Sequence, residues 1–138
     1  KKYLGIVTNL DRHDQSGSHW TSIFIVIDPI LSSYGIYYYD SAGSGIPKLI
    51  LLYIKEVQRQ LKQIYPNKLC KIRVNKKQFQ KSSTECGMFA ITYQIRWITK
   101  LFNNPNTLEK HILTSTMTDK NMIESRDKFF SPRLDKLM

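Results

Sequence analysis

A ten-residue run, HWTSIFIVID (19–28), limits the possible folds of this chain more than any other stretch. It is rich in aromatic and β-branched residues, which favour strands, and it ends at Asp28-Pro29. Its apolar side chains do not alternate with polar ones, so both faces of the predicted strand are expected to be buried. We therefore predict a strand inside a sheet that is covered on both sides.

Three other segments have the patterns of strands. Residues 3–9 (YLGIVTN) and 36–40 (IYYYD) are predicted to be antiparallel neighbours of the central run. Residues 68–75 (KLCKIRVN) alternate as a strand with one apolar and one basic face. The apolar face carries Cys70, Ile72 and Val74, and the opposite face carries Lys71 and Arg73.

Three segments predict helices. The first begins at Pro47 and ends before Pro66-Asn67, with apolar residues at helical spacing: Ile50, Tyr53, Ile54, Val57, Leu61 and Ile64. The second runs from about Cys86 to Phe102, and the third from about Asp119 to Phe130. No repeat or linker divides the chain, so we interpret residues 1–138 as a single α+β domain. The missing initiator Met leaves open that an N-terminal portion is lacking.

The composition excludes several classes of protein. No run of about 18 apolar residues is present, and the N-terminus lacks the small-residue cleavage site of a secretory signal, so we expect a soluble chain without a membrane anchor. Cys70 and Cys86 are too few for a disulfide framework, which favours a reducing, intracellular compartment. We predict no cofactor and leave the oligomeric state open, with a monomer favoured.

Three chemically useful residues stand at the ends of predicted elements. His19 opens the central strand, Asp40 closes the strand after it, and Cys86 begins a helix. Each alone has an ordinary interpretation, as a solvated His, a turn-forming Asp and a buried apolar Cys. The positive end of a helix, however, stabilises a thiolate over a thiol. A His can move its proton, a carboxylate can orient that His, and hydrogen-bond donors from Gln80 and the Cys86 backbone can stabilise an acyl intermediate.

The motifs GSHW (17–20), YYYDS (37–41) and QKSSTECG (80–87) resemble those of the adenovirus-endopeptidase and ubiquitin-like-protease clan of cysteine peptidases. The resemblance covers roughly residues 5 to 100. It implies a papain-like architecture of this clan's type, in which helices flank a central mixed sheet and the nucleophile stands at a helix N-terminus. It also implies His19 as general base, Asp40 as its orienting group, Cys86 as nucleophile and Gln80 as oxyanion donor.

Three further residues have weaker assignments. Trp20 resembles the clan's aromatic neighbour beside the cleft and is a candidate substrate-binding residue, with a core position as the alternative. Gln78 competes for the role of oxyanion donor, but the six-residue gap from Gln80 to Cys86 fits the clan better. His13 is interpreted as a solvated loop residue; a metal site with Asp11 and His19 is disfavoured, because no metal-ligand spacing is evident.

The chain is strongly basic, with 21 Lys and Arg against 11 Asp and Glu and a net charge of +10. Such a surface attracts anions such as nucleic acid, an anionic membrane or an acidic protein. Six cations between 68 and 81, with no acid among them, predict a basic surface that leads towards the cleft and could bind DNA as a polyanionic activator. The alternative is a solvated strand edge whose charges discourage aggregation. The six are Lys68, Lys71, Arg73, Lys76, Lys77 and Lys81.

Four functions remain open at this point. We favour a viral-type endopeptidase that processes structural polyproteins at Gly-containing sites during virion maturation, in the host cytoplasm and the virion. The segment from 103 to 132 favours it, because it resembles the tails of capsid-maturation proteases of large DNA viruses in its Asn-rich turn, Arg-bearing helix and Phe pair. The deconjugating branch of the clan also ends in an Arg-containing helix, so this segment leaves that alternative open. The alternatives are a protease for SUMO or other ubiquitin-like modifiers, an acetyltransferase with the same triad, and a non-catalytic module that binds nucleic acid. The triad spacing argues against the last.

Overall fold

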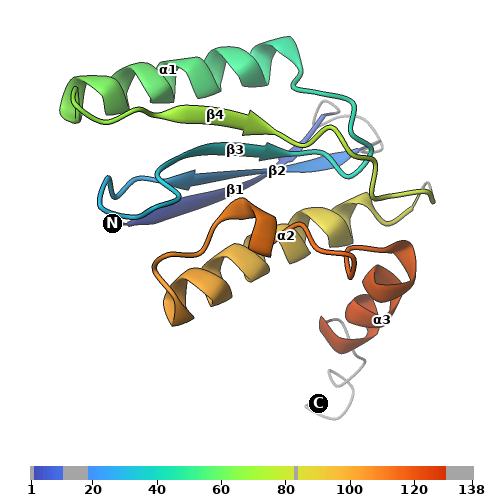
Figure 1. Ribbon diagram of the computed structural model, residues 1–138. Helices are drawn as coiled ribbons and strands as arrows, with labels where there is room; N and C mark the ends of the chain where they lie inside the picture. Colours follow the sequence, from blue (N-terminus) through green and yellow to red (C-terminus); the bar gives the residue numbers. More distant parts are fainter. Residues whose placement is uncertain (1, 11–18, 83, 130–138) are drawn as a thin grey trace, which may run out of the picture.

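The structure, a computed structural model, describes residues 2–10, 19–82 and 84–129 (Figure 1). Its elements, in chain order, are β1 (Tyr3–Asn9), β2 (Trp20–Val26), β3 (Gly35–Tyr39), α1 (Lys48–Ile64), β4 (Lys71–Val74), α2 (Cys86–Asn103), a 3-10 turn (Glu109–His111) and α3 (Asp119–Phe129). The predicted α+β class and the order of strands and helices are therefore confirmed. The strand expected over 68–75 is shorter than predicted, and the 3-10 turn was not predicted.

The four strands form one mixed sheet in the order β1-β2-β3-β4. β2 pairs antiparallel with both β1 and β3, as predicted, whereas β4 runs parallel to β3. In this register Asn9 lies opposite Trp20, Ser22 opposite Tyr39, and Tyr38 opposite Val74. The start of β2 therefore shares one end of the sheet with the ends of the other three strands.

The helices α1 and α2 cover opposite faces of the sheet (Figure 1). Along β2, Ile23 and Ile25 enter the apolar cluster under α1, while Phe24 and Val26 enter the cluster under α2. The prediction that this strand is buried on both faces is thus confirmed, and every residue of β2 after Trp20 is buried. Because each face has its own cluster, the core has two layers.

The predicted apolar stripe of α1 is only partly correct. Ile54 and Leu61 are buried, but Tyr53 is 46% and Ile64 63% exposed. The physical reason is the position of the helix, which contacts β3 and β4 near one edge of the sheet and therefore covers a narrow strip. Among the helices of the described residues, none combines the length and apolar character that would be needed to cross a bilayer.

A buried polar residue that the sequence did not single out fixes α2 against the sheet. The Nε2 atom of Gln94 donates to the carbonyl oxygens of Ile6 at 3.1 Å and Ile23 at 2.8 Å, and to Ser22 Oγ at 2.9 Å. Ser22 Oγ in turn donates to the Ala90 carbonyl at 2.7 Å. These bonds tie the helix to β1 and β2, and so fix where its first residue lies.

Candidate active site

His19 and Asp40 lie side by side at one end of the sheet. His19 immediately precedes β2 and Asp40 immediately follows β3, so antiparallel pairing of the two strands brings them together. His19 Nε2 is 2.6 Å from Asp40 Oδ1, and Asp40 is almost fully buried, with 1% of its side chain exposed against 21% for His19. A short hydrogen bond to a buried carboxylate orients an imidazole and stabilises its protonated form.

Neighbouring groups hold the Asp40 carboxylate in place. Its Oδ1 accepts the Ala42 N–H at 2.8 Å and its Oδ2 accepts the Ser44 N–H at 3.2 Å. The Asn75 side chain pairs with the backbone of Asp40, accepting its N–H at 2.9 Å and donating to its carbonyl at 2.5 Å. Asn75 follows β4, so the parallel strand contributes directly to the end of the sheet where His19 stands.

Cys86 is the first residue of α2 and lies on the buried stripe of that helix. The residues at helical spacing after it, Phe89, Tyr93 and Trp97, are fully buried against the sheet, so the thiol turns to the same side. Its Sγ atom accepts the backbone N–H of Trp20 at 3.5 Å. Because Trp20 directly follows His19 in the chain, this contact places the thiol at the end of the sheet where His19 lies.

The second cysteine has a different environment. Cys70 lies in the apolar cluster under α1 and is 1% exposed. Burial raises the pKa of its thiol, and a hydrogen bond with Tyr34 opposes this only in part. A buried thiol with a raised pKa is a poor nucleophile. Both cysteines are free.

Gln80 lies on the segment that leads to Cys86 and is 5% exposed. Its Oε1 accepts from Ser41 Oγ at 2.6 Å, which orients the amide, and its Nε2 donates to the Ser82 carbonyl at 2.7 Å. Within the part of the chain that the structure describes, one amide N–H is used by Ser82 and the other is left for a further acceptor. Gln78, the competing residue, is exposed and donates to the Gln80 carbonyl at 2.9 Å.

A hollow of about 290 Å³ borders the helix start at Cys86. Trp20 forms part of its wall and is 40% exposed, so the alternative of a core position for Trp20 is wrong. Its role in substrate binding stays a prediction. The lining is largely apolar and comprises Val7, Trp20, Gly87, Met88, Ile91 and Arg126.

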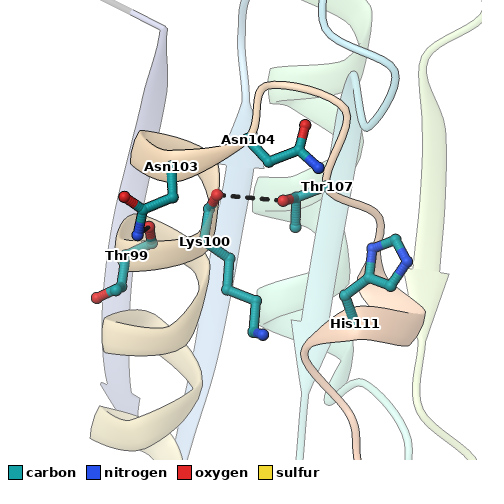
Figure 2. Close-up of a pocket in the computed structure, with 6 residues that line it drawn as sticks. All are labelled: Thr99, Lys100, Asn103, Asn104, Thr107 and His111. Atoms are coloured by element: carbon teal, nitrogen blue, oxygen red, sulfur yellow. Dashed lines mark hydrogen bonds between the residues drawn. The ribbon is translucent and has the colours of Figure 1, made fainter.

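A larger hollow, of about 400 Å³, lies at the other end of α2 (Figure 2). It is lined by Thr99, Lys100, Asn103, Asn104, Thr107 and His111. Thr107 Oγ1 donates to the Lys100 carbonyl at 3.1 Å, which closes the turn after the helix. None of the predicted catalytic residues lines this hollow.

The predicted basic surface follows the exposed edge strand β4. Lys71 and Arg73 point away from the apolar cluster, as their alternation predicts, and Lys76 and Lys77 follow on the exposed segment. Because β4 runs parallel to β3, this row of cations leads from the far end of the sheet to the end where Asp40 lies. Whether the row binds nucleic acid stays a prediction.

The structure adds residues that sequence reasoning missed. Ser41 orients the side chain of Gln80, and Asn75 binds the backbone of Asp40. Glu85, which directly precedes Cys86, forms an ion pair with Arg126 of α3. Only the register of β4 against β3 could have indicated Asn75, since no local motif marks it. The disfavoured metal set with Asp11 and His13 falls in 11–18, outside the described residues.

Comparisons with known proteins agree on one group. A cysteine protease of African swine fever virus, from a Malawi tick isolate, is 32% identical over 127 residues, which cover 92% of this chain and 43% of that protein. The relative from a South African tick isolate, named a SUMO-1 cysteine protease, is 30% identical with the same coverage of 92% and 43%. No family model matches the chain.

The fold agrees with a solved structure of the same viral group. The crystal structure of the African swine fever virus protease, in its selenomethionine form, matches with a TM-score of 0.68 and 25% sequence identity. The match covers 91% of this chain and 43% of that one. The chain thus spans less than half the length of the relatives it matches.

Proposed function

The chain belongs to the ubiquitin-like-protease clan of cysteine peptidases, and from this premise we propose that it hydrolyses peptide bonds with Cys86 as nucleophile, His19 as general base and Asp40 as orienting group. The observation that carries the proposal is the 2.6 Å pairing of His19 with a buried Asp40, next to a thiol that accepts the Trp20 N–H. The relatives named above are cysteine proteases, which favours the same chemistry here.

The geometry suggests how the proton moves. Nε2 of His19 faces Asp40, so Nδ1 is the ring nitrogen left to take the proton of the Cys86 thiol. The thiolate attacks the carbonyl carbon of the scissile bond and forms a carbon–sulfur bond. The imidazolium then returns the proton to the leaving amine as the carbon–nitrogen bond breaks. A water deprotonated by His19 hydrolyses the thioester and releases Cys86.

The negative charge that develops on the carbonyl oxygen needs donors. We assign these to the backbone N–H of Cys86, at the positive end of α2, and to the Gln80 amide N–H that Ser82 does not use. The Ser41 hydroxyl fixes the orientation of that amide, since it donates to Gln80 Oε1. Preorganised donors of this kind require little rearrangement during the reaction.

For the substrate, we propose the processing of viral structural polyproteins at Gly-containing sites. The apolar hollow beside Trp20 and Gly87 offers a surface for the residues that flank the bond. A second candidate is removal of a SUMO-like modifier, because one relative is named a SUMO-1 cysteine protease. The two activities share their chemistry and differ only in what the surface around the site recognises.

The deciding experiment offers the protein three substrates in parallel: Gly-Gly-containing polyprotein peptides, SUMO-like conjugates and acetyl-CoA with an acceptor peptide. We expect cleavage of the peptides, abolished by Cys86→Ala and unaffected by Cys70→Ala. Cleavage of the conjugates alone would favour the modifier protease. Acetyl transfer without hydrolysis, or turnover that survives Cys86→Ala, would overturn the proposal.

A further inference from the structure

The helix α3 holds the segment that joins Gln80 to Cys86. Near the start of α3, Asp119 accepts the backbone N–H of Lys81 at 2.9 Å and that of Ser82 at 3.3 Å through Oδ2, and the Ser82 hydroxyl at 2.9 Å through Oδ1. In Figure 1 this helix lies beside the N-terminal end of α2. The C-terminal helix is therefore fastened to the candidate active site and not only to the core.

The residue immediately before Cys86 is a buried acid. Glu85 is 4% exposed and occupies the N-cap position of α2, but its side chain makes no capping hydrogen bond to the helix. A negative charge in this position stabilises the helix, yet it also repels the negative charge of a thiolate on the next residue. An uncompensated carboxylate here would therefore oppose the chemistry proposed for Cys86.

Arg126 of α3 supplies the compensating charge. Its guanidinium nitrogen Nη2 lies 2.9 Å from Glu85 Oε2 and also donates to the Thr84 carbonyl at 3.4 Å. The Glu85 contact is an ion pair without the alignment of a good hydrogen bond, so its effect is mainly electrostatic. Arg126 also lines the apolar hollow beside Gly87, which places its positive charge at the start of α2.

We propose that Arg126 is a positioning residue for the nucleophile: by neutralising the buried Glu85 carboxylate, it lets the positive end of α2 favour the Cys86 thiolate. The docking of α3 thereby sets the reactivity of a residue on a different helix. This inference rests on the proposed function only for the identity of Cys86 as the nucleophile. It concerns the reactivity of the Cys86 thiol and does not depend on which substrate the protein cleaves.

Three other charged groups near this helix start have partners of their own. His19 and Asp40 pair with each other on the sheet side, and Asp119 is occupied by backbone and hydroxyl donors from Lys81 and Ser82. Neither Glu85 nor Arg126 is a partner in any of these bonds. A change in thiol reactivity can therefore be attributed to the Glu85–Arg126 pair.

The test measures alkylation of Cys86 by iodoacetamide in the native chain, at pH 6 and at pH 8.5, with the adduct located by peptide mapping. The variants are Arg126→Gln, Arg126→Lys, Glu85→Gln and the double variant Glu85→Gln/Arg126→Gln. We expect Arg126→Gln to lower the ratio of the pH 6 rate to the pH 8.5 rate by about tenfold, because an unpaired carboxylate disfavours the neighbouring thiolate. Arg126→Lys keeps the charge and should keep the wild-type ratio.

The double variant separates charge from structure. If Arg126 acts through its charge, removing the Glu85 charge as well should restore the wild-type ratio of the two alkylation rates. If Arg126 only supports the structure, Arg126→Gln should lower both alkylation rates together, and the double variant should not recover them. Glu85→Gln alone should keep or raise the pH 6 rate, which makes the inference testable even if Arg126→Gln does not fold. An unchanged ratio in Arg126→Gln, or a lower one in Glu85→Gln, would overturn it.

The same experiment separates this inference from the proposed function. Preferential labelling of Cys70 in the wild type would contradict the assignment of Cys86 as the nucleophile, and with it the proposed protease. Rapid labelling of Cys86 that is indifferent to Arg126 would leave the protease intact and overturn only the role of α3.

Discussion

His19 Nε2 lies 2.6 Å from Asp40 Oδ1, although the two residues are 21 positions apart in the chain. The same carboxylate oxygen accepts the Ala42 N–H at 2.8 Å, so the turn after β3 aims the Asp40 side chain before the imidazole contacts it. The imidazole is thus oriented by a group that is itself fixed. The functional consequences of this arrangement can be measured.

Asp40→Asn should reduce turnover without abolishing it. An amide oxygen can still accept from the Ala42 N–H and from the ring of His19, but it no longer stabilises the imidazolium by its charge. His19→Ala removes the base and should abolish turnover. Steady-state kcat and KM on a cleavable peptide give the comparison. Equal activity of Asp40→Asn and wild type would show that the Asp40 charge contributes nothing.

Cys86 should be the reactive thiol and Cys70 the inert one. Cys70 is buried among apolar side chains, and burial raises the pKa of its thiol, so its thiolate is scarce at mild pH and gains population only as the pH rises. Cys86 stands at the positive end of α2. Brief alkylation of the native protein near pH 7, followed by peptide mapping, should find the adduct on Cys86, and labelling of Cys70 first would contradict the assignment.

Gln80→Ala should lower kcat by about 10²-fold or more, because one donor to the oxyanion is lost. The matched control is Gln78→Ala, since the Gln78 side chain is exposed and donates to the backbone carbonyl of Gln80 and not to its amide. A KM that stays near the wild-type value in Gln80→Ala would place the loss in the transition state. Full activity in Gln80→Ala with loss in Gln78→Ala would show that the other glutamine is the donor.

Local patterns predicted the fold well because its central strand carries a strong signal. The uninterrupted apolar run of β2 requires two covering layers, and Phe24 and Ile25 do enter separate clusters. The stripe of α1 was predicted too wide, because periodicity shows which residues are apolar and does not show how far the sheet extends beneath Tyr53. That extent depends on the parallel placement of β4, which no local pattern encodes.

The site could be predicted only in part for a related reason. His19, Asp40 and Cys86 stand at element boundaries, which a sequence marks through changes of pattern. The residues that support them do not stand at such visible boundaries. Asn75 binds Asp40 because the register of β4 against β3 brings them together, and Arg126 contacts Glu85 from a helix about 40 residues further along the chain. Interactions of that kind need three-dimensional packing to be found.

Gly5→Ala should destabilise the protein through Gln94. A Cβ on Gly5 would lie 2.0 Å from Gln94 Oε1, so the amide would have to move and break the bonds that tie α2 to β1 and β2. We expect a loss of about 1–3 kcal/mol in the free energy of unfolding, the cost of buried polar groups left unpaired. Urea denaturation measures it. In the control Gly87→Ala, the added Cβ would stand 3.7 Å from Trp20 Cδ1, an ordinary contact, and equal stability of the two variants would contradict the argument.

The row of cations along β4 should bind DNA if it is a functional surface. Lys71 and Arg73 project from an edge strand, and Lys76 and Lys77 continue the row towards the end of the sheet that holds Asp40. Each phosphate neutralised releases counterions, so affinity should fall steeply with salt. A solvated edge that merely discourages aggregation would show weak binding that these residues do not affect.

Lys71→Glu/Arg73→Glu tests which interpretation holds. Loss of two phosphate contacts should weaken binding and make the slope of log affinity against log salt shallower by about two. Lys48→Glu/Lys55→Glu on α1 changes the net charge by the same amount at exposed positions on the other side of the fold, and it should retain most of the binding if location matters. Titrations of a short duplex at two salt concentrations give both slopes. An equal loss of DNA affinity in the two double variants would mean that binding depends only on the net charge of the protein. Equal, weak binding by the wild type and both variants would mean that these cations contribute only to solubility.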